Sequence, residues 1–151
     1  MTNLRSIVEK KLTSIDLPIA DVIDKLQQSF IQNKNIILQA SPGAGKTTIV
    51  PLVLLQQLKS GQKILLLQPR RIAARNAALR LSQILEEEVG QTVGYRVRNE
   101  TKVSGLTKLE VITEGILIRM LQSDPELGDV GLIIFDEFHE RNLDSDLGLA
   151  F

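Results

Sequence analysis

Apolar residues form two kinds of pattern along the chain, and the way these patterns alternate predicts the fold class. Short runs of apolar residues indicate buried strands, and apolar residues three or four positions apart indicate one face of a helix. The runs predict strands at 35–39, 63–68, 93–98, 109–113 and 130–135. Because helical patterns separate them, we expect an α/β domain, in which helices flank both faces of a parallel sheet.

The helical patterns also divide the chain into two parts. A short amphipathic helix is expected within residues 1–16, before Leu17-Pro18, and a second helix follows with Ile19, Val22, Ile23, Leu26 and Phe30 on one face. Further helices are predicted at 48–55, from 72 to about 88, after Glu114, and from near 144. We therefore expect an N-terminal helix, 1–16, and one α/β domain, 17–151.

A glycine-rich turn joins the first predicted strand to the helix at 48–55. It runs from Ala40 to Thr47 as Ala-Ser-Pro-Gly-Ala-Gly-Lys-Thr, and a strand, such a turn and a helix form the P-loop arrangement. Backbone N–H groups of the turn surround a phosphate, and the helix N-terminus adds donors and a positive dipole end. The predicted nucleotide-binding residues are Pro42, Gly43, Ala44, Gly45, Lys46, Thr47 and Thr48.

Two of these residues have chemical roles beyond the backbone. Lys46 is expected to act as a catalytic cation on the β- and γ-phosphates, and the Thr47 hydroxyl to bind Mg²⁺. Ala40 stands where the P-loop pattern has glycine, a substitution that a negative φ tolerates. The alternative is a glycine-rich turn that binds nothing, and the correctly placed Lys46-Thr47 pair argues against it.

The last predicted strand delivers two acids, Asp136 and Glu137. Asp136 is expected to hold Mg²⁺, and Glu137 to orient and deprotonate an attacking water. Two solvated acids at the end of a strand are the alternative, and the upstream P-loop favours the catalytic interpretation. The expected cofactors are therefore ATP and Mg²⁺, and no guanine-reading Asn-Lys-x-Asp is present to indicate a GTPase.

The chemistry-bearing segments all follow predicted strands. They are the P-loop, 69–71, 113–115 and 136–137. Ligands of parallel sheets bind at the carboxyl ends of the strands, so we expect these segments to share one edge of the sheet.

Composition narrows the possible partners. The chain has 151 residues, no cysteine and a net charge of +0, so it has no disulfide or thiolate site, and any nucleic-acid binding must come from local basic clusters. Arginines form two such clusters, although solvated side chains would explain them equally well: Arg70, Arg71 and Arg75, then Arg96 and Arg98. Neither a membrane span nor a signal-peptide pattern occurs, which fits a cytoplasmic location.

With these segments in place, the chain from about Leu17 to Phe151 resembles the DEAH-box helicases of superfamily 2. Residues 40–48 are similar to motif I, 69–75 to motif Ia, 113–115 to motif Ib and 136–141 to motif II. Pro51 falls where the family has a proline, and Phe138 replaces the alanine of the DEAH name. The resemblance implies a RecA-like domain of an ATP-dependent RNA or DNA helicase.

The resemblance also implies residue roles. Arg80 would stack on the nucleotide base, and His139 would couple the ATP site to a second domain. Contacts to RNA or single-stranded nucleic acid would come from Arg70, Arg71, Arg96, Thr113, Glu114 and Gly115.

Two family features do not appear in the sequence, namely the Ser-Ala-Thr of motif III and a second RecA-like domain with its arginine finger. The chain thus resembles a partial first RecA-like domain. It is either the motor domain of a helicase or a truncated module that binds ATP or RNA without turnover. A P-loop protein unrelated to helicases would require the other motifs to be coincidental. Because the motif III strand would lie inside the sheet, we expect the isolated chain to be marginally folded, with little ATPase activity.

Overall fold

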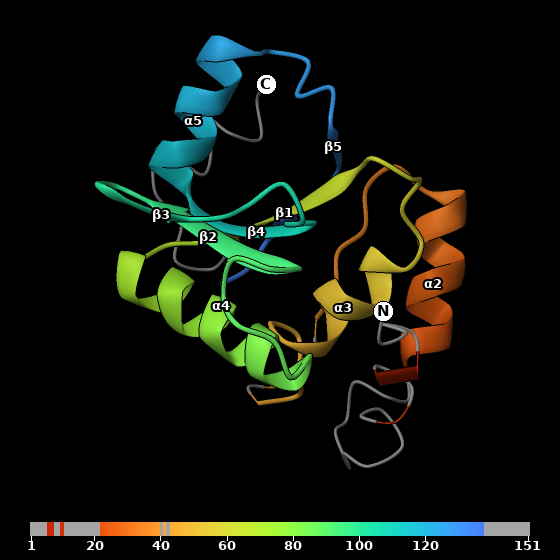
Figure 1. The fold of residues 1–151 in the computed structure, drawn as a ribbon. Helices are drawn as coiled ribbons and strands as arrows, with labels where there is room; N and C mark the ends of the chain where they lie inside the picture. Colours follow the sequence, from red (N-terminus) through yellow and green to blue (C-terminus); the bar gives the residue numbers. More distant parts are fainter. Residues whose placement is uncertain (1–5, 8–9, 11–21, 40, 42, 138–151) are drawn as a thin grey trace. The chain divides into compact units, whose positions relative to one another are not determined.

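A computed structural model describes residues 6–7, 10, 22–39, 41 and 43–137, and the chain forms two compact units, Met1–Gln57 and Leu58–Phe151 (Figure 1). The first unit contains the helices α2 (Ile23–Gln32) and α3 (Ile49–Leu55). The second contains a five-stranded sheet and two helices.

Both helices of the first unit confirm predictions. In α2 the apolar face buries Ile23 and Leu26, whereas Ile19 lies outside the described residues. Every residue of α3 is buried, including Pro51 at its third position, where the missing N–H would have no partner within the helix. Of the predicted helix at 1–16, only Ser6, Ile7 and Lys10 are described, and all three are helical.

The predicted strand at 35–39 is wrong. These residues form neither strand nor helix, and Ile37 is 98% exposed. A strand exists only when a second strand satisfies its backbone groups, and the described residues of this unit provide none. The apolar run therefore predicted a preference for burial, but it could not supply the neighbouring strand.

The second unit is built on a sheet with the strand order β3-β2-β4-β1-β5. Its strands are β1 (Lys63–Gln68), β2 (Val93–Val97), β3 (Glu100–Lys102), β4 (Leu109–Thr113) and β5 (Val130–Phe135). Four of them are parallel neighbours and confirm the predicted strands, whereas β3 runs antiparallel to β2. The sequence analysis did not predict β3, which is short, polar and formed by a tight turn at Asn99, where φ is 66°.

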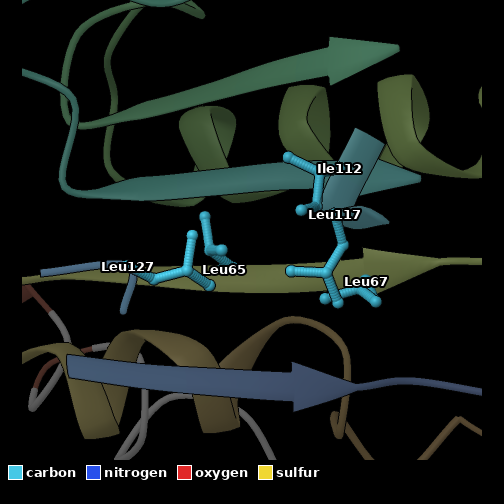
Figure 2. Packing of buried hydrophobic residues seen from close by; sticks show 5 residues of the cluster. All are labelled: Leu65, Leu67, Ile112, Leu117 and Leu127. Carbon is cyan, nitrogen blue, oxygen red and sulfur yellow. The ribbon is translucent and has the colours of Figure 1, made fainter. Parts of the chain in front are cut away.

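Helices α4 (Arg71–Ile84) and α5 (Glu114–Ser123) cover opposite faces of this sheet (Figure 1). Small buried residues, Ala74, Ala77 and Ala78, line α4, so its backbone can approach the strands closely. On the other face, α5 packs over an apolar cluster (Figure 2): Leu65, Leu67, Ile112, Leu117 and Leu127. The predicted α/β fold with flanking helices is thus confirmed for this unit.

Helix α4 ends four residues earlier than the predicted end near Glu88. The N–H of Glu87 bonds to the Ser82 carbonyl and that of Glu86 to the Gln83 carbonyl, which is the hydrogen-bond pattern of a Schellman motif. Glu86 takes the left-handed position of that motif, with φ 58°. The sequence offered Gly90 as the stop signal, whereas the chain stops the helix with a non-glycine residue.

Strand β5 lies at one edge of the sheet and pairs with β1. No strand in the described part of the chain lies along its other side. Its apolar residues are accordingly only half-buried, in contrast to the fully buried central strands β1 and β4.

Candidate nucleotide and nucleic-acid site

Three of the chemistry-bearing segments share one edge of the sheet. Gln68 at the end of β1 pairs in register with Thr113 at the end of β4, and Leu67 pairs with Phe135 of β5. Residues 69–71, 113–115 and 136–137 therefore leave three neighbouring parallel strands at their carboxyl ends. This confirms the expected arrangement for the second unit, whereas the placement of the P-loop at the same edge stays a prediction because the P-loop belongs to the other unit.

The Asp136 carboxylate is held by hydrogen bonds at both oxygens. Gln68 Nε2 donates to Oδ2 at 2.6 Å, and the Glu137 N–H donates to Oδ1 at 2.9 Å. The Asp136 N–H in turn donates to the Leu67 carbonyl at 3.2 Å, so the backbone is anchored to β1 as well. A carboxylate has about four lone-pair positions, so it can accept these bonds and still bind a cation or a water.

The donor set fits Mg²⁺. Carboxylate and hydroxyl oxygens, as in Asp136 and Thr47, are the hard ligands that this ion prefers, and Mg²⁺ at phosphate sites usually takes only one or two carboxylates. Among the residues that the structure describes, no cluster of three or more His, Cys, Asp or Glu side chains could hold a metal by itself. A magnesium ion here would therefore depend on phosphate oxygens for the rest of its ligands.

Glu137 follows with an exposed side chain and a φ of 52°. This left-handed backbone turns the chain away from the strand direction, so the two acids do not simply alternate across the sheet. Non-glycine residues in this region cost about 1–3 kcal/mol and concentrate at functional sites. The observation agrees with a functional role for Glu137 without proving it.

The P-loop curls around one of its own carbonyl groups. Lys46 Nζ donates to the Ser41 carbonyl at 3.1 Å, and the Ile49 N–H donates to the Gly45 carbonyl at 2.8 Å. Gly43 and Gly45 have φ values of 76° and 96°, a region that glycine enters without steric cost. Glycine at these two positions is therefore explained by the backbone, while Pro42 lies outside the described residues.

The predicted nucleic-acid residues fall into two groups. Arg70, Arg71 and Gly115 are exposed at the carboxyl edge, and Thr113 and Glu114 are half-buried there, Thr113 as the N-cap of α5. Arg96 lies in β2, where its Nε donates to Glu110 Oε2 at 2.6 Å. Its guanidinium is thus already engaged inside the protein.

A second arginine of the basic clusters, Arg75, belongs to a polar network between α4 and the β2–β3 hairpin. Its guanidinium pairs with the Glu100 carboxylate, which also accepts the Tyr95 hydroxyl. The Tyr95 hydrogen bond, followed by the one from Arg75, lowers the pKa of Glu100 below its ordinary value. The same carboxylate raises the pKa of Arg75, so this network is charged at neutral pH.

The remaining predicted residues are placed less informatively. Arg80 is exposed on α4, ten residues beyond Arg70, or roughly 15 Å along the helix axis. That distance takes it away from the carboxyl edge of its own unit. His139 and the segment predicted to be helical from near 144 lie outside the described residues.

Sequence reasoning missed Gln68 as a site residue. Its only signal was a polar residue that closes an apolar run, and the structure shows it buried with its amide on Asp136. None of the helices in the described part of the chain is long and apolar enough to cross a bilayer.

Comparison with known proteins identifies the class. The profile of the DEAD/DEAH box helicase family matches residues 20–146, and the chain belongs to this family. Its fold is that of a RecA-like helicase domain: a crystal structure of the Escherichia coli DExH-box NTPase HrpB superimposes with a TM-score of 0.84 at 51% identity, covering 90% of this chain and 17% of that one.

Within the family the chain is similar to HrpB. It is 52% identical over 134 residues to the ATP-dependent RNA helicase HrpB of Escherichia coli (strain K12), covering 89% of this chain. It is 39% identical to the pre-mRNA-splicing factor ATP-dependent RNA helicase DEAH10 of Arabidopsis thaliana. The resemblance to DEAH-box helicases is thus confirmed. The chain spans 17% and 19% of the lengths of these two relatives.

Proposed function

We propose that this chain is the first RecA-like domain of a cytoplasmic ATP-dependent RNA helicase, which binds ATP with Mg²⁺ and couples its hydrolysis to nucleic-acid binding. Membership of the helicase family supports this proposal, as do the names of its relatives, which are ATP-dependent RNA helicases. The family likeness favours RNA over DNA as the bound nucleic acid.

The proposed roles follow the chemistry of each group. Backbone N–H groups of the P-loop hold the phosphates, and Lys46 places a positive charge on the β- and γ-phosphates. Thr47 and Asp136 hold Mg²⁺, which neutralises the charge that develops on the phosphate oxygens when bound. Glu137 accepts a proton from the attacking water.

The nucleic-acid contacts are proposed at the same sheet edge as Asp136. Arg70 and Arg71 carry exposed guanidinium groups that match phosphate geometry, and Thr113, Glu114 and Gly115 offer a helix N-terminus beside them. The observation that carries the proposal is the Asp136 carboxylate, fixed at the end of β5 two strands away from Thr113. Groups for a metal and groups for a nucleic-acid backbone thus leave neighbouring strands together.

Two variants test the proposal in any longer protein that contains this chain with a second RecA-like domain. Lys46→Ala should abolish RNA-stimulated phosphate release, because cationic clamps on the transferred phosphate supply several kcal/mol of transition-state stabilisation. Glu137→Gln should keep nucleotide affinity while blocking release, because it retains shape but removes the base. Wild-type turnover in Lys46→Ala would contradict the assignment. Nucleotide and RNA binding without turnover in the unmodified protein would instead favour a binding module.

A further inference from the structure

Gln68 is the last residue of β1, and its side chain is buried although it is polar. The residue is 4% exposed, and the four residues before it in the strand are buried and apolar. A buried amide costs free energy unless it is hydrogen-bonded, so an apolar side chain would serve packing at this position at least as well. The choice of glutamine therefore calls for a partner that needs an amide.

That partner is the Asp136 carboxylate on the neighbouring strand. Gln68 Nε2 donates to Asp136 Oδ2 at 2.6 Å, across β1 and β5 and 68 positions apart in the sequence. The other oxygen, Oδ1, accepts the N–H of Glu137. One donor on each oxygen sets the rotation of the carboxylate plane, and only the Gln68 amide comes from a different strand.

We propose that Gln68 is a positioning residue that orients the Asp136 carboxylate for the magnesium ion of the bound nucleotide. The inference rests on the proposed function, since it assumes that Asp136 holds that ion. Hydrogen-bond partners of metal-binding carboxylates fix the direction of the ligand lone pairs, and their loss typically lowers metal affinity about 10–100-fold. Gln68 itself touches neither the nucleotide nor the metal in this role.

The test separates orientation of the carboxylate from packing. Gln68→Met keeps a similar volume without the donor, and Gln68→Asn keeps the amide but shortens the side chain by one methylene. Gln62→Met is the matched control, because Gln62 precedes β1 at its opposite end and bonds to the Lys59 N–H. Binding of a fluorescent ATP analogue is measured as MgCl₂ is varied, and Mn²⁺ affinity is measured by electron paramagnetic resonance with the nucleotide present.

Both Gln68 variants should require about 10-fold more Mg²⁺ for half-maximal nucleotide binding, while binding without divalent cation stays at the wild-type level. Gln62→Met should behave as the wild type. An unchanged Mg²⁺ requirement in Gln68→Met and Gln68→Asn would overturn the inference, and so would an equal loss of affinity with and without the cation. Absence of any Mg²⁺ effect in the wild type would instead overturn the proposed function, which distinguishes the two failures.

Discussion

Arg96 and Glu110 form an ion pair across neighbouring strands, with Arg96 Nε 2.6 Å from Glu110 Oε2. Lys63 approaches the other carboxylate oxygen, Oε1, at 3.0 Å, and Asp129 lies 2.8 Å from the same ammonium. Glu110 is 3% exposed, so its charge is out of water and depends on these two cations. The pKa of Lys63 is raised, because its hydrogen bonds to Asp129 and Glu110 outweigh the lowering by burial.

Loss of Arg96 should therefore destabilise the fold. Arg96→Ala leaves the buried Glu110 carboxylate with one cation, and hydrogen bonds to charged groups contribute about 1.5–3 kcal/mol, so we expect a loss of about 2 kcal/mol in the free energy of unfolding. Arg98→Ala, in the exposed turn two residues later, is the control and should change it by less than about 0.5 kcal/mol. Urea unfolding measures both. Equal midpoints would show that Glu110 does not depend on Arg96.

Removal of Arg70 and Arg71 should weaken RNA binding at low salt. Phosphate contacts carry charge but no sequence information, so the double substitution Arg70→Ala with Arg71→Ala should lower affinity similarly for different single-stranded sequences. The slope of log affinity against log salt should flatten by about one. Fluorescence anisotropy with labelled RNA at several salt concentrations measures both effects.

The control for this experiment removes two exposed charges elsewhere in the same unit, Lys59→Ala with Arg119→Ala. It should leave the salt slope closer to that of the wild type. A preference for one RNA sequence that disappears with Arg70 and Arg71 would mean that these residues read bases.

Tyr95 should set the acidity of Glu100. Its hydroxyl makes the largest contribution to the lowered pKa of Glu100, ahead of Arg75, so Tyr95→Phe should raise that pKa while keeping the ring in the core. A carboxyl group with a lowered folded-state pKa stabilises the fold above its unfolded pKa, and this stabilisation is lost as the pH falls through the folded value. Part of the acid sensitivity of the fold should therefore lie below pH 4.5, the ordinary value for this group.

Carboxyl ¹³C resonances followed from pH 7 to pH 2 give the pKa of Glu100 in both proteins. Urea midpoints at pH 7 and pH 3.5 should differ less in Tyr95→Phe than in the wild type. The same pKa in both proteins would mean that the hydroxyl contributes nothing in solution.

Glu86 is a site at which glycine should stabilise the protein. Its φ of 58° costs an L-residue about 1–2 kcal/mol, of which the greater chain entropy of glycine offsets a part. We expect Glu86→Gly to raise the free energy of unfolding by about 0.5–1 kcal/mol. Gln83→Gly, three residues earlier on the exposed side of α4, should lower it by about 1 kcal/mol. A lower urea midpoint for Glu86→Gly would contradict the Schellman geometry.

These particulars show where sequence patterns suffice. The strands β1, β4 and β5 were predictable because each is an apolar run whose partners lie in the same sheet. The run at 35–39 looks the same in sequence but has no partner strand in its unit, and β3 lacks an apolar run because a tight turn at Asn99 brings it to β2. Patterns of one segment do not contain its neighbours.

The polar residues show a similar division. Motif positions such as Lys46 and Asp136 are recognisable because their chemistry needs those residue types in that order. Gln68 and Glu110 are recognisable only in three dimensions, because what makes them notable is burial beside a specific partner. The proposed role of Arg96 in nucleic-acid binding likewise competes with a demand for its guanidinium that no linear pattern reveals.

The place of β5 at the sheet edge has a consequence for solvent access to its backbone. Amide groups of a strand point alternately to its two sides, and the Asp136 N–H points to β1. Every second amide before it therefore faces β1, and the others face the side along which the described chain has no strand. Amide deuterium exchange along β5 should consequently alternate between slow and fast, and any segment that adds to this edge would slow the fast set alone.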